Sequence, residues 1–487
     1  YPNVDWREFA MHRFAPQQRH DLSISSGTQN TRYYGGLSYY HQGTILKTDN
    51  NKNDRVTYRF NVDNNFEKIK LRLHTGIDGF VENNVLPLSA TAGSYYGIFS
   101  HIQNSPSNKA PLNEFGLPYG ASDNLAIELS PLSGYNKNTS RVFNGIMGLD
   151  LEVPHVTGLH LKANANYNMW NSIGKAWNVS APSYDLGSTV PVPGNPPTLT
   201  AASGNGSSVT LQGFVAYTKS FGLHNLDFLG GYEMSRADTG NFSASRQSYQ
   251  IIYDQFVAGP TVNQLANGSE KEGVRAGYVG RIKYDYAAKY FLEGSIRYDA
   301  SDLFPPDSRW GTFYAVSAGW MLSDESFLHF LKDRKIFDML KLRGSYGVTG
   351  TSDNVGAFVY VPGYNVNANA WVINGIPQQG TSEGSLPSSS YSWYTIRSRN
   401  IGLDFASLRE RLTGSIDYFY TRTTGYVQSD TRYAGPLGKA LPVINSDAAR
   451  RKEGAEFNVA WNDEVAGLHY QVGVNYSYYN QLWEKYP

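Results

Sequence analysis

Polar and apolar residues alternate along many segments of this chain. Between residues 290 and 299 the even positions, from Tyr290 to Tyr298, are apolar or glycine, and the odd positions from Glu293 onward are polar or charged, with Phe291 as the one exception. The same alternation recurs in residues 55–63, 69–78, 159–169, 275–286, 340–349, 412–421 and 468–478. Because successive side chains of a strand point to opposite faces, this pattern predicts strands with one apolar and one polar face.

Two features favour a membrane β-barrel over a soluble sandwich, which also alternates. The apolar positions of these segments carry no charged residue. Aromatic residues gather near the predicted strand ends, namely Tyr284, Tyr286, Tyr290, Tyr298, Tyr418 and Tyr420. Rings at both ends of spanning strands form the aromatic girdles of such barrels, so the apolar face is predicted to contact lipid.

The connections between the predicted strands alternate between short and long. The short ones are residues 27–31, 64–67, 155–158, 220–224, 287–289, 407–411 and 462–467. The long ones, rich in Gly, Pro, Ser, Thr and Asn, are residues 85–138, 179–207, 250–272, 353–393 and 429–447. Residues 323–339 replace one short turn and are predicted to contain a short helix. The fold class is therefore all-β, an antiparallel transmembrane β-barrel of about sixteen strands with long extracellular loops and short periplasmic turns.

The order of short and long connections also predicts where the barrel strands begin and end. A first strand near residues 20–27 and a last strand near residues 468–480 would both have their free ends outside the cell. Bacterial outer-membrane barrels begin and end at the periplasm. We therefore expect residues 1–487 to be a barrel domain that is incomplete at both ends, with further strands on either side.

Composition narrows the class of protein further. The chain has 40% hydrophobic residues, a mean hydropathy of −0.43 and no run of roughly 18 apolar residues, which excludes a helical membrane protein. Lys and Arg together number 42 and so do Asp and Glu, so no electrostatic footprint for nucleic acid exists. Cysteine is absent, which excludes disulfides, thiolate metal sites and a cysteine nucleophile.

Candidate catalytic and metal motifs have simpler explanations. Residues 380–384 match the G-x-S-x-G nucleophile elbow, but a long loop lacks the strand and helix that this elbow requires. Residues 49–54 are rich in oxygen ligands but lack the Gly and distant Glu of a calcium loop. His74, His160 and His469 fall on polar strand faces without metal-ligand spacing. We expect no enzyme, no catalytic residue, no metal site and no cofactor.

Aromatic residues in the long loops are the candidate ligand-binding residues. Rings with adjacent polar groups stack on sugar faces, which singles out Tyr95, Tyr96, Tyr119, Trp371 and Trp393. The alternative is that these rings pack loop against loop. The cationic residues on the polar strand faces are predicted to pair with carboxylates of neighbouring strands or of a plug; they are Arg55, Arg59, Lys70, Arg72, Arg281, Arg297 and Arg343.

Several blocks of residues resemble the barrel of SusC/RagA family TonB-linked outer-membrane transporters. They are Asp5-Trp6, 14–16, 20–25, 278–281, 295–299, 309–311, 317–320, 325–327, 340–347, 400–404, 417–420 and 451–456. These blocks follow the family's order over nearly the whole chain. Ala300 and Leu303 stand where the family usually has Gly and Arg, and Tyr314 lacks the usual nearby Pro.

The resemblance implies a 22-stranded plugged barrel in the outer membrane of a Gram-negative bacterium. It also implies import of an oligosaccharide or peptide nutrient, energised by TonB, together with a SusD-like surface lipoprotein and with outer-membrane lipid around the barrel. The plug and the TonB-contacting segment would precede Tyr1. Two alternatives remain open at this point: a passive porin-like channel and a secreted all-β glycan-binding module or propeller enzyme.

Overall fold

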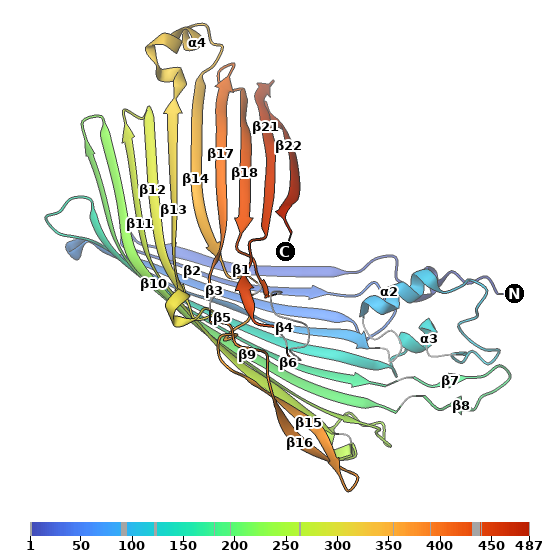
Figure 1. Cartoon of the computed structure of the whole chain (residues 1–487). Coiled ribbons are helices and arrows are strands. Elements are labelled where there is room, and N and C mark those ends of the chain that lie inside the picture. The colour runs from blue at the N-terminus through green and yellow to red at the C-terminus, as the bar shows by residue number, and fades with distance from the viewer. Residues whose placement is uncertain are drawn as a thin grey trace. The chain divides into compact units, whose positions relative to one another are not determined.

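The computed structural model describes residues 2–88, 95–120, 124–179, 181–194, 196–262, 264–353, 355–389, 391–430, 439 and 441–486. Strands make up most of these residues, and the helices are few and short (Figure 1). Within the described residues, none of the helices has the length and apolar character needed to cross a membrane.

One antiparallel sheet holds sixteen strands, and neighbours along the chain are neighbours in the sheet. In order these strands are β1 Gln17–Gly27, β2 Thr31–Gln42, β3 Lys52–Phe66, β4 Leu71–Leu88, β5 Gly134–Glu152, β6 Leu159–Asn178, β9 Thr198–Phe221, β10 His224–Gln247, β11 Leu265–Tyr286, β12 Tyr290–Ser301, β13 Trp310–Met321, β14 Met339–Thr351, β17 Tyr394–Ser407, β18 Leu412–Thr424, β21 Ala449–Val465 and β22 Leu468–Lys485. The predicted all-β class and the count of about sixteen strands are confirmed.

Short and long connections alternate as predicted, but several strands are longer than the alternation indicated. β4 continues to Leu88, β9 begins at Thr198, β11 begins at Leu265 and β22 continues to Lys485, so the predicted loop and strand bounds were wrong there. The additional residues of β9 and β11 include many Gly, Ser, Asn and Thr, which give no apolar signal, and those of β4 are apolar without alternation. Backbone ladder bonds do not require apolar side chains, so such residues extend a strand without revealing it.

The long connections also contain secondary structure that the sequence did not predict. A hairpin of β15 Tyr364–Ile373 and β16 Ile376–Glu383 lies in the connection predicted as a loop over residues 353–393. The small pairs are β7 Ser183–Tyr184 with β8 Pro191–Val192, and β19 Val427–Ser429 with β20 Val443–Asn445. Of the 3-10 turns, η2 Phe256–Ala258 lies in a long connection, and the others lie elsewhere: η1 Glu67–Ile69, η3 Pro306–Ser308, η4 Leu322–Asp324 and η5 Ser326–Leu328.

The chain divides into two compact units, and the first comprises residues 1–149, 164–210 and 236–272. One buried cluster lies among helices and connections, and a second joins Trp177 of β6 and Leu199 of β9 to Tyr249. α1 Trp6–Ala10, α2 Tyr95–Asn104 and α3 Leu125–Glu128 contribute Trp6, Ile98 and Leu125 to the first cluster, with Leu46 from the connection after β2. Asp5 caps α1 by accepting hydrogen bonds from the backbone N–H groups of Arg7 and Glu8.

The second unit comprises residues 150–163, 211–235 and 273–487. The predicted short helix over residues 323–339 is confirmed as η4, η5 and α4 His329–Asp333 between β13 and β14. At the opposite ends of these strands, Phe304 and Tyr391 are fully buried in the connections. In both units, therefore, the most buried side chains lie in the connections and near the strand ends beside them.

Candidate functional site

The apolar face of the second unit is continuous across strands. The register sets Ile296 of β12 opposite Tyr314 of β13, and Tyr314 opposite Val348 of β14. Ile296 is 53% exposed although it is apolar, and its neighbours Leu292 and Val316 are exposed too. An extended apolar surface of this kind is unfavourable in water and favourable against hydrocarbon. The predicted lipid-facing side is thus a real surface of the sheet.

An aromatic belt borders this face at the ends of the strands that lead to long connections. The ring centroid of Tyr278 lies 5.0 Å from that of Tyr232 and 6.3 Å from that of Trp310, and Tyr298 stacks on Trp310 at 4.6 Å. A second belt lies at the short-turn ends, where Tyr290 stacks with Tyr286 at 6.3 Å and with Trp320 at 6.4 Å.

The distance between the two belts is close to the height of the apolar band of an outer-membrane barrel. From Tyr290 to Tyr298 the chain rises about 26 Å at roughly 3.3 Å per residue, and a strand tilt near 40° reduces that rise to about 20 Å. The apolar band of such barrels is about 25 Å tall. The predicted aromatic girdles are therefore confirmed at both ends of these strands.

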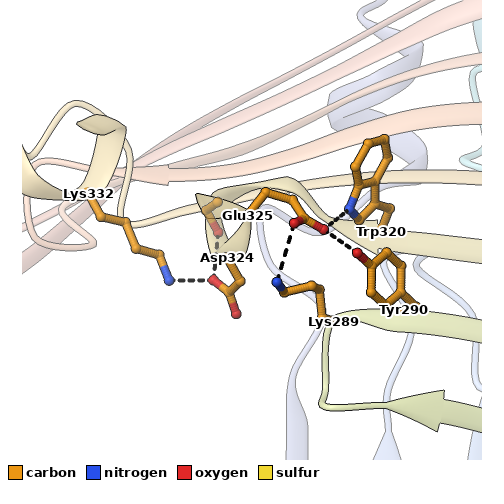
Figure 2. A network of polar contacts seen from close by, with 7 residues as sticks. Lys289, Tyr290, Trp320, Asp324, Glu325 and Lys332 are labelled. Atoms are coloured by element: carbon orange, nitrogen blue, oxygen red, sulfur yellow. Dashed lines mark hydrogen bonds and ion pairs between the residues drawn. The ribbon is translucent and has the colours of Figure 1, made fainter. Parts of the chain in front are cut away.

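A polar network fastens the helical turn to the short-turn belt (Figure 2). The Glu325 carboxylate accepts hydrogen bonds from the Tyr290 hydroxyl at 2.5 Å and the Trp320 indole at 2.9 Å, and Lys289 lies 3.4 Å away. These donors lower the pKa of Glu325. The ammonium group of Lys332 donates to Asp324 and lowers the pKa of that carboxyl as well.

The opposite, polar face is linked by charges that bridge strands. Arg343 of β14 donates to Oδ2 of Asp404 on β17 at 3.0 Å and to Oδ2 of Asp417 on β18 at 2.7 Å. Gly402 lies between these partners in the register, opposite both Arg343 and Asp417. A Cβ atom at Gly402 would stand 2.6 Å from Oδ1 of Asp417, so the glycine leaves room for the guanidinium. Three strands are thereby joined by charge-assisted hydrogen bonds.

Other predicted cationic residues of the polar face also pair with carboxylates of the sheet. Arg297 bonds Asp299 at 2.9 Å and lies 3.6 Å from Glu233. The other pairs are Arg281 with Asp227 at 3.4 Å and Arg55 with Glu82 at 3.7 Å. For Arg343, Arg297, Arg281 and Arg55 the predicted pairing within the sheet is confirmed.

A recess of about 470 Å³ opens on this polar face. Its lining includes Lys283, Glu293, Ser317, Lys341 and Arg343. Charges of both signs and a hydroxyl therefore face the same space. Such a surface attracts polar solutes without selecting one sign of charge.

Each of the three histidines predicted on polar strand faces lies beside one carboxylate. His74 lies 2.7 Å from Asp63, His160 lies 2.7 Å from Asp150, and His469 lies 3.5 Å from Glu464. Across the part of the chain that the structure describes, no group of three or more potential metal ligands occurs. Ser382 of the G-x-S-x-G match lies within strand β16 and accepts a hydrogen bond from Asn367, so the strand-turn-helix of a nucleophile elbow does not form there.

The predicted ligand-binding aromatics occupy different environments. Tyr95 begins α2, where only its backbone is described, and the next residue, Tyr96, is 80% exposed. Tyr119 is half-buried, and its carbonyl accepts a hydrogen bond from Asn124. These three residues belong to the first unit.

Trp371 and Trp393 lie in the second unit and differ from each other. Trp371 is 59% exposed on hairpin strand β15. Trp393 is half-buried: its indole donates to the Arg309 carbonyl at 2.9 Å, and its ring packs 4.9 Å from Phe304 and 5.5 Å from Phe313. Ligand binding by any of the five aromatics stays a prediction.

The sequence predicts Arg343 as a pairing cation but does not predict the residues that complete its network. Asp404, Asp417 and Gly402 lie on two other strands, at positions that only the sheet register brings together. The alternation placed Asp417 on the polar face but did not cover Asp404. It carried no signal for which arginine they bind.

Comparison with known proteins agrees with this architecture. Residues 132–486 match the family described as TonB dependent receptor-like, beta-barrel. SusC, a TonB-dependent receptor of Bacteroides thetaiotaomicron, is 26% identical over 450 residues, which cover 88% of this chain and 43% of SusC. The TonB-dependent receptor P26 of Formosa agariphila is 26% identical over 454 residues, 87% of this chain and 41% of that relative. The chain thus spans less than half the length of these curated relatives.

Solved structures show the same fold. The RagAB peptide transporter matches with a TM-score of 0.82 at 18% identity, covering 100% of this chain and 52% of that chain. The ferric citrate transporter FecA matches with a TM-score of 0.55 at 9% identity, covering 97% of this chain and 57% of that chain. TonB-dependent receptors are outer-membrane β-barrel proteins of Gram-negative bacteria, and the family is one of receptors and transporters, not enzymes. By its family match, its SusC-like sequence and its belted antiparallel sheet, the chain belongs to the TonB-dependent receptor β-barrel family.

Proposed function

We propose that this chain is the barrel part of an importer that moves an oligosaccharide or peptide nutrient across the outer membrane. Energy would come from TonB through a plug segment outside residues 1–487. The observation that carries the proposal is the pairing of an apolar, belted face with a polar face rich in paired charges, in a chain of the TonB-dependent receptor family. Membership of that outer-membrane family excludes a secreted glycan-binding module.

The polar face supplies groups that suit such a nutrient. The recess beside Lys283, Glu293 and Arg343 presents ammonium, carboxylate and guanidinium groups, which hydrogen-bond sugar hydroxyls and peptide amides alike. Because Arg343 is already held by two carboxylates, it offers a rigid surface with little free charge. Passage by a polar solute would then need no strong binding site along the sheet.

Ligand capture is assigned to the exposed loop aromatics. Trp371 and Tyr96 are the strongest candidates, since both side chains are largely exposed and an exposed ring can stack on a sugar or a peptide side chain. Trp393 packs on Phe304 and is the matched comparison in the same connection. A SusD-like lipoprotein is the proposed partner, as a lid over the loops; one relative is SusC and one structural neighbour is the RagAB peptide transporter.

The proposal is tested by uptake in cells that carry the full-length gene on a deletion background. Labelled oligosaccharides and labelled peptides of similar size are offered separately, with and without TonB. We expect accumulation of one class that requires TonB. Accumulation that continues unchanged without TonB would establish the passive porin-like channel instead.

The role of the loop aromatics is tested in the same cells. Trp371→Ala is expected to lower uptake at subsaturating substrate by roughly tenfold, since stacking of one ring is worth about 1–3 kcal/mol. The control is Trp393→Phe, which keeps an aromatic ring against Phe304 and should transport normally. Equal uptake by Trp371→Ala and the unmodified protein would remove Trp371 from the proposed site.

A further inference from the structure

Four arginines lie on the apolar face of the second unit, where strands β17, β18 and β21 approach their long connections. Arg397 pairs in register with Arg422, and Arg422 pairs in register with Arg451. Arg399 lies two residues closer to the apolar band, opposite Tyr346 on one side and Tyr420 on the other. Directly opposed residues of an antiparallel pair share a face, so three guanidinium groups form one row across three strands.

This row departs from the rest of the same face. Strands β11 to β14 carry no charged residue among the described positions in register with Ile296 and its apolar neighbours. On β17 and β18 the face is likewise apolar closer to the short turn, with Leu403 opposite Ile416 and Ile401 opposite Tyr418. The arginines therefore begin where the apolar residues end.

The row lies at the outer boundary of the membrane. Three residues in register with one another beside the β17–β18 turn, Ser407, Leu412 and Trp461, serve as the reference level. Each arginine of the row lies ten residues along its own strand from that level: Arg397 from Ser407, Arg422 from Leu412 and Arg451 from Trp461. Ten residues rise about 33 Å along a strand, or about 25 Å at a tilt near 40°. That height equals the roughly 25 Å apolar band, so the guanidinium groups lie at the level of lipid headgroups.

Only part of this positive charge is balanced by the protein. Arg422 bonds Glu484 at 2.6 Å, and Arg451 lies 3.3 Å from Glu453. Arg397 donates to the neutral Thr424 hydroxyl at 3.0 Å. With four arginines and two carboxylates, the patch keeps a net charge of about +2, and like charges directly opposite one another destabilise a sheet.

The Arg399 guanidinium is also accessible to a further acceptor. Arg399 lies over the rings of Tyr346 and Tyr420, at 5.9 and 5.8 Å, and is exposed. Arginine binds phosphate through two parallel N–H···O bonds, which suits a planar group held at its base by aromatic rings.

We propose that Arg397, Arg399, Arg422 and Arg451 bind the phosphate groups of an anionic lipid headgroup in the outer leaflet. The positive charge of the row complements phosphate, and the row is continuous with the lipid-facing surface. The tyrosines beside Arg399 would lie at the border of the lipid chains, and the phosphates would lie just above them. Nutrient import does not require this site, so the proposal goes beyond the proposed function.

The test measures lipid retained by the full-length protein after detergent extraction from outer membranes. Arg397→Gln/Arg399→Gln removes two cations that have no carboxylate partner in the described structure, so no acidic group is left unpaired. The matched control is Arg411→Gln beside the opposite, short turn, where Arg411 lies 3.3 Å from Asp463. Bound phosphorylated lipid is quantified by mass spectrometry, and folding is checked by the heat-dependent gel mobility of the barrel.

We expect the double variant to retain roughly tenfold less phosphorylated lipid than the unmodified protein, because each lost hydrogen bond to a charged group lowers affinity strongly. The control should retain the normal amount. Added inorganic phosphate should displace little lipid from the unmodified protein. Lipid whose phosphate groups have been removed should bind poorly, and equally so, to the unmodified protein and the double variant.

Equal retention of phosphorylated lipid by the unmodified protein and the folded double variant would overturn the proposal. Complete displacement by inorganic phosphate would also overturn it, since the ligand would then be a free anion. If the double glutamine variant does not fold, Arg397→Lys/Arg399→Lys is used, which keeps the charge but loses the paired donors. It should retain an intermediate amount, and unchanged retention would again count against the site.

Discussion

The two faces of strands β12 to β18 follow different physical rules. On the apolar face, Ile296 and Val316 are each exposed, and each contributes through its own contact with lipid. On the polar face, Arg343 holds Asp404 and Asp417 from two other strands. Changes on the apolar face should therefore act one residue at a time, whereas changes on the polar face should spread across strands.

The largest loss of folding free energy is expected when a charged residue is placed on the apolar face. Ile296→Arg places a charge against hydrocarbon and should cost about 2–4 kcal/mol in folding free energy near the middle of the bilayer. Arg297→Ala, at the next position on the other face, should cost far less because its partners Asp299 and Glu233 remain accessible to water. Reversible unfolding in lipid measures the folding free energy of both variants. Equal losses would show that the assignment of these residues to the two faces is wrong.

A smaller effect is expected from removing the central cation of the polar face. Arg343→Met leaves Asp404 and Asp417 side by side without a partner and should cost roughly 1–3 kcal/mol. The triple variant that also carries Asp404→Asn and Asp417→Asn should recover part of this loss. A cycle built from these variants and unfolded in the same lipid measures the coupling, and simple additivity would contradict a three-strand network.

Gly402 offers a milder test of the same network. Gly402→Ala places Cβ 2.7 Å from Cζ of Arg343 and 2.6 Å from Oδ1 of Asp417, so one of these groups must move. The expected cost is about 1 kcal/mol, the worth of one displaced hydrogen bond. Gly344→Ala on the apolar face is the control, since its nearest atom would be 3.8 Å away, and it should be neutral.

The smallest effect is expected at the helical turn and depends on pH. Hydrogen bonds lower the pKa of both Asp324 and Glu325, so their stabilisation is complete above the ordinary carboxyl pKa and is lost as the pH falls through the lowered values. The turn should stay docked from about pH 8 to pH 5 and loosen below about pH 4. Because the chain has no cysteine, a fluorophore on Phe327→Cys reports this change at a single site. Glu325→Gln should weaken the docking at neutral pH.

Much of the fold follows from the sequence because side-chain alternation is a local property. A strand with one lipid face and one wet face must alternate, and Tyr290 and Tyr298 mark its two boundaries within a single segment. Structure inside the long connections has no such constraint. Helices α2 and α3 are stabilised by contacts with residues far away in the chain, so they went unpredicted. The β15–β16 hairpin pairs locally around Asn374–Gly375, a turn signal that the search for alternation did not use.

For the candidate site residues, too, the sequence predicted some properties and only the structure decided the others. Sequence alone placed Arg343, Trp371 and Trp393 on a face or in a loop. It did not determine that Trp393 packs on Phe304 while Trp371 is exposed, since loop aromatics with similar neighbours have either fate.

The sequence by itself determined the class of protein, the two faces of the sheet and the alternation of turns and loops, because each is written within a few consecutive residues. Only the tertiary structure decided which charges meet. Arg397, Arg422 and Arg451 are 25 to 29 positions apart in the chain, and the antiparallel register alone sets them in one row. Pairing across strands depends on hydrogen-bond register, which side-chain periodicity restricts to one face but does not specify.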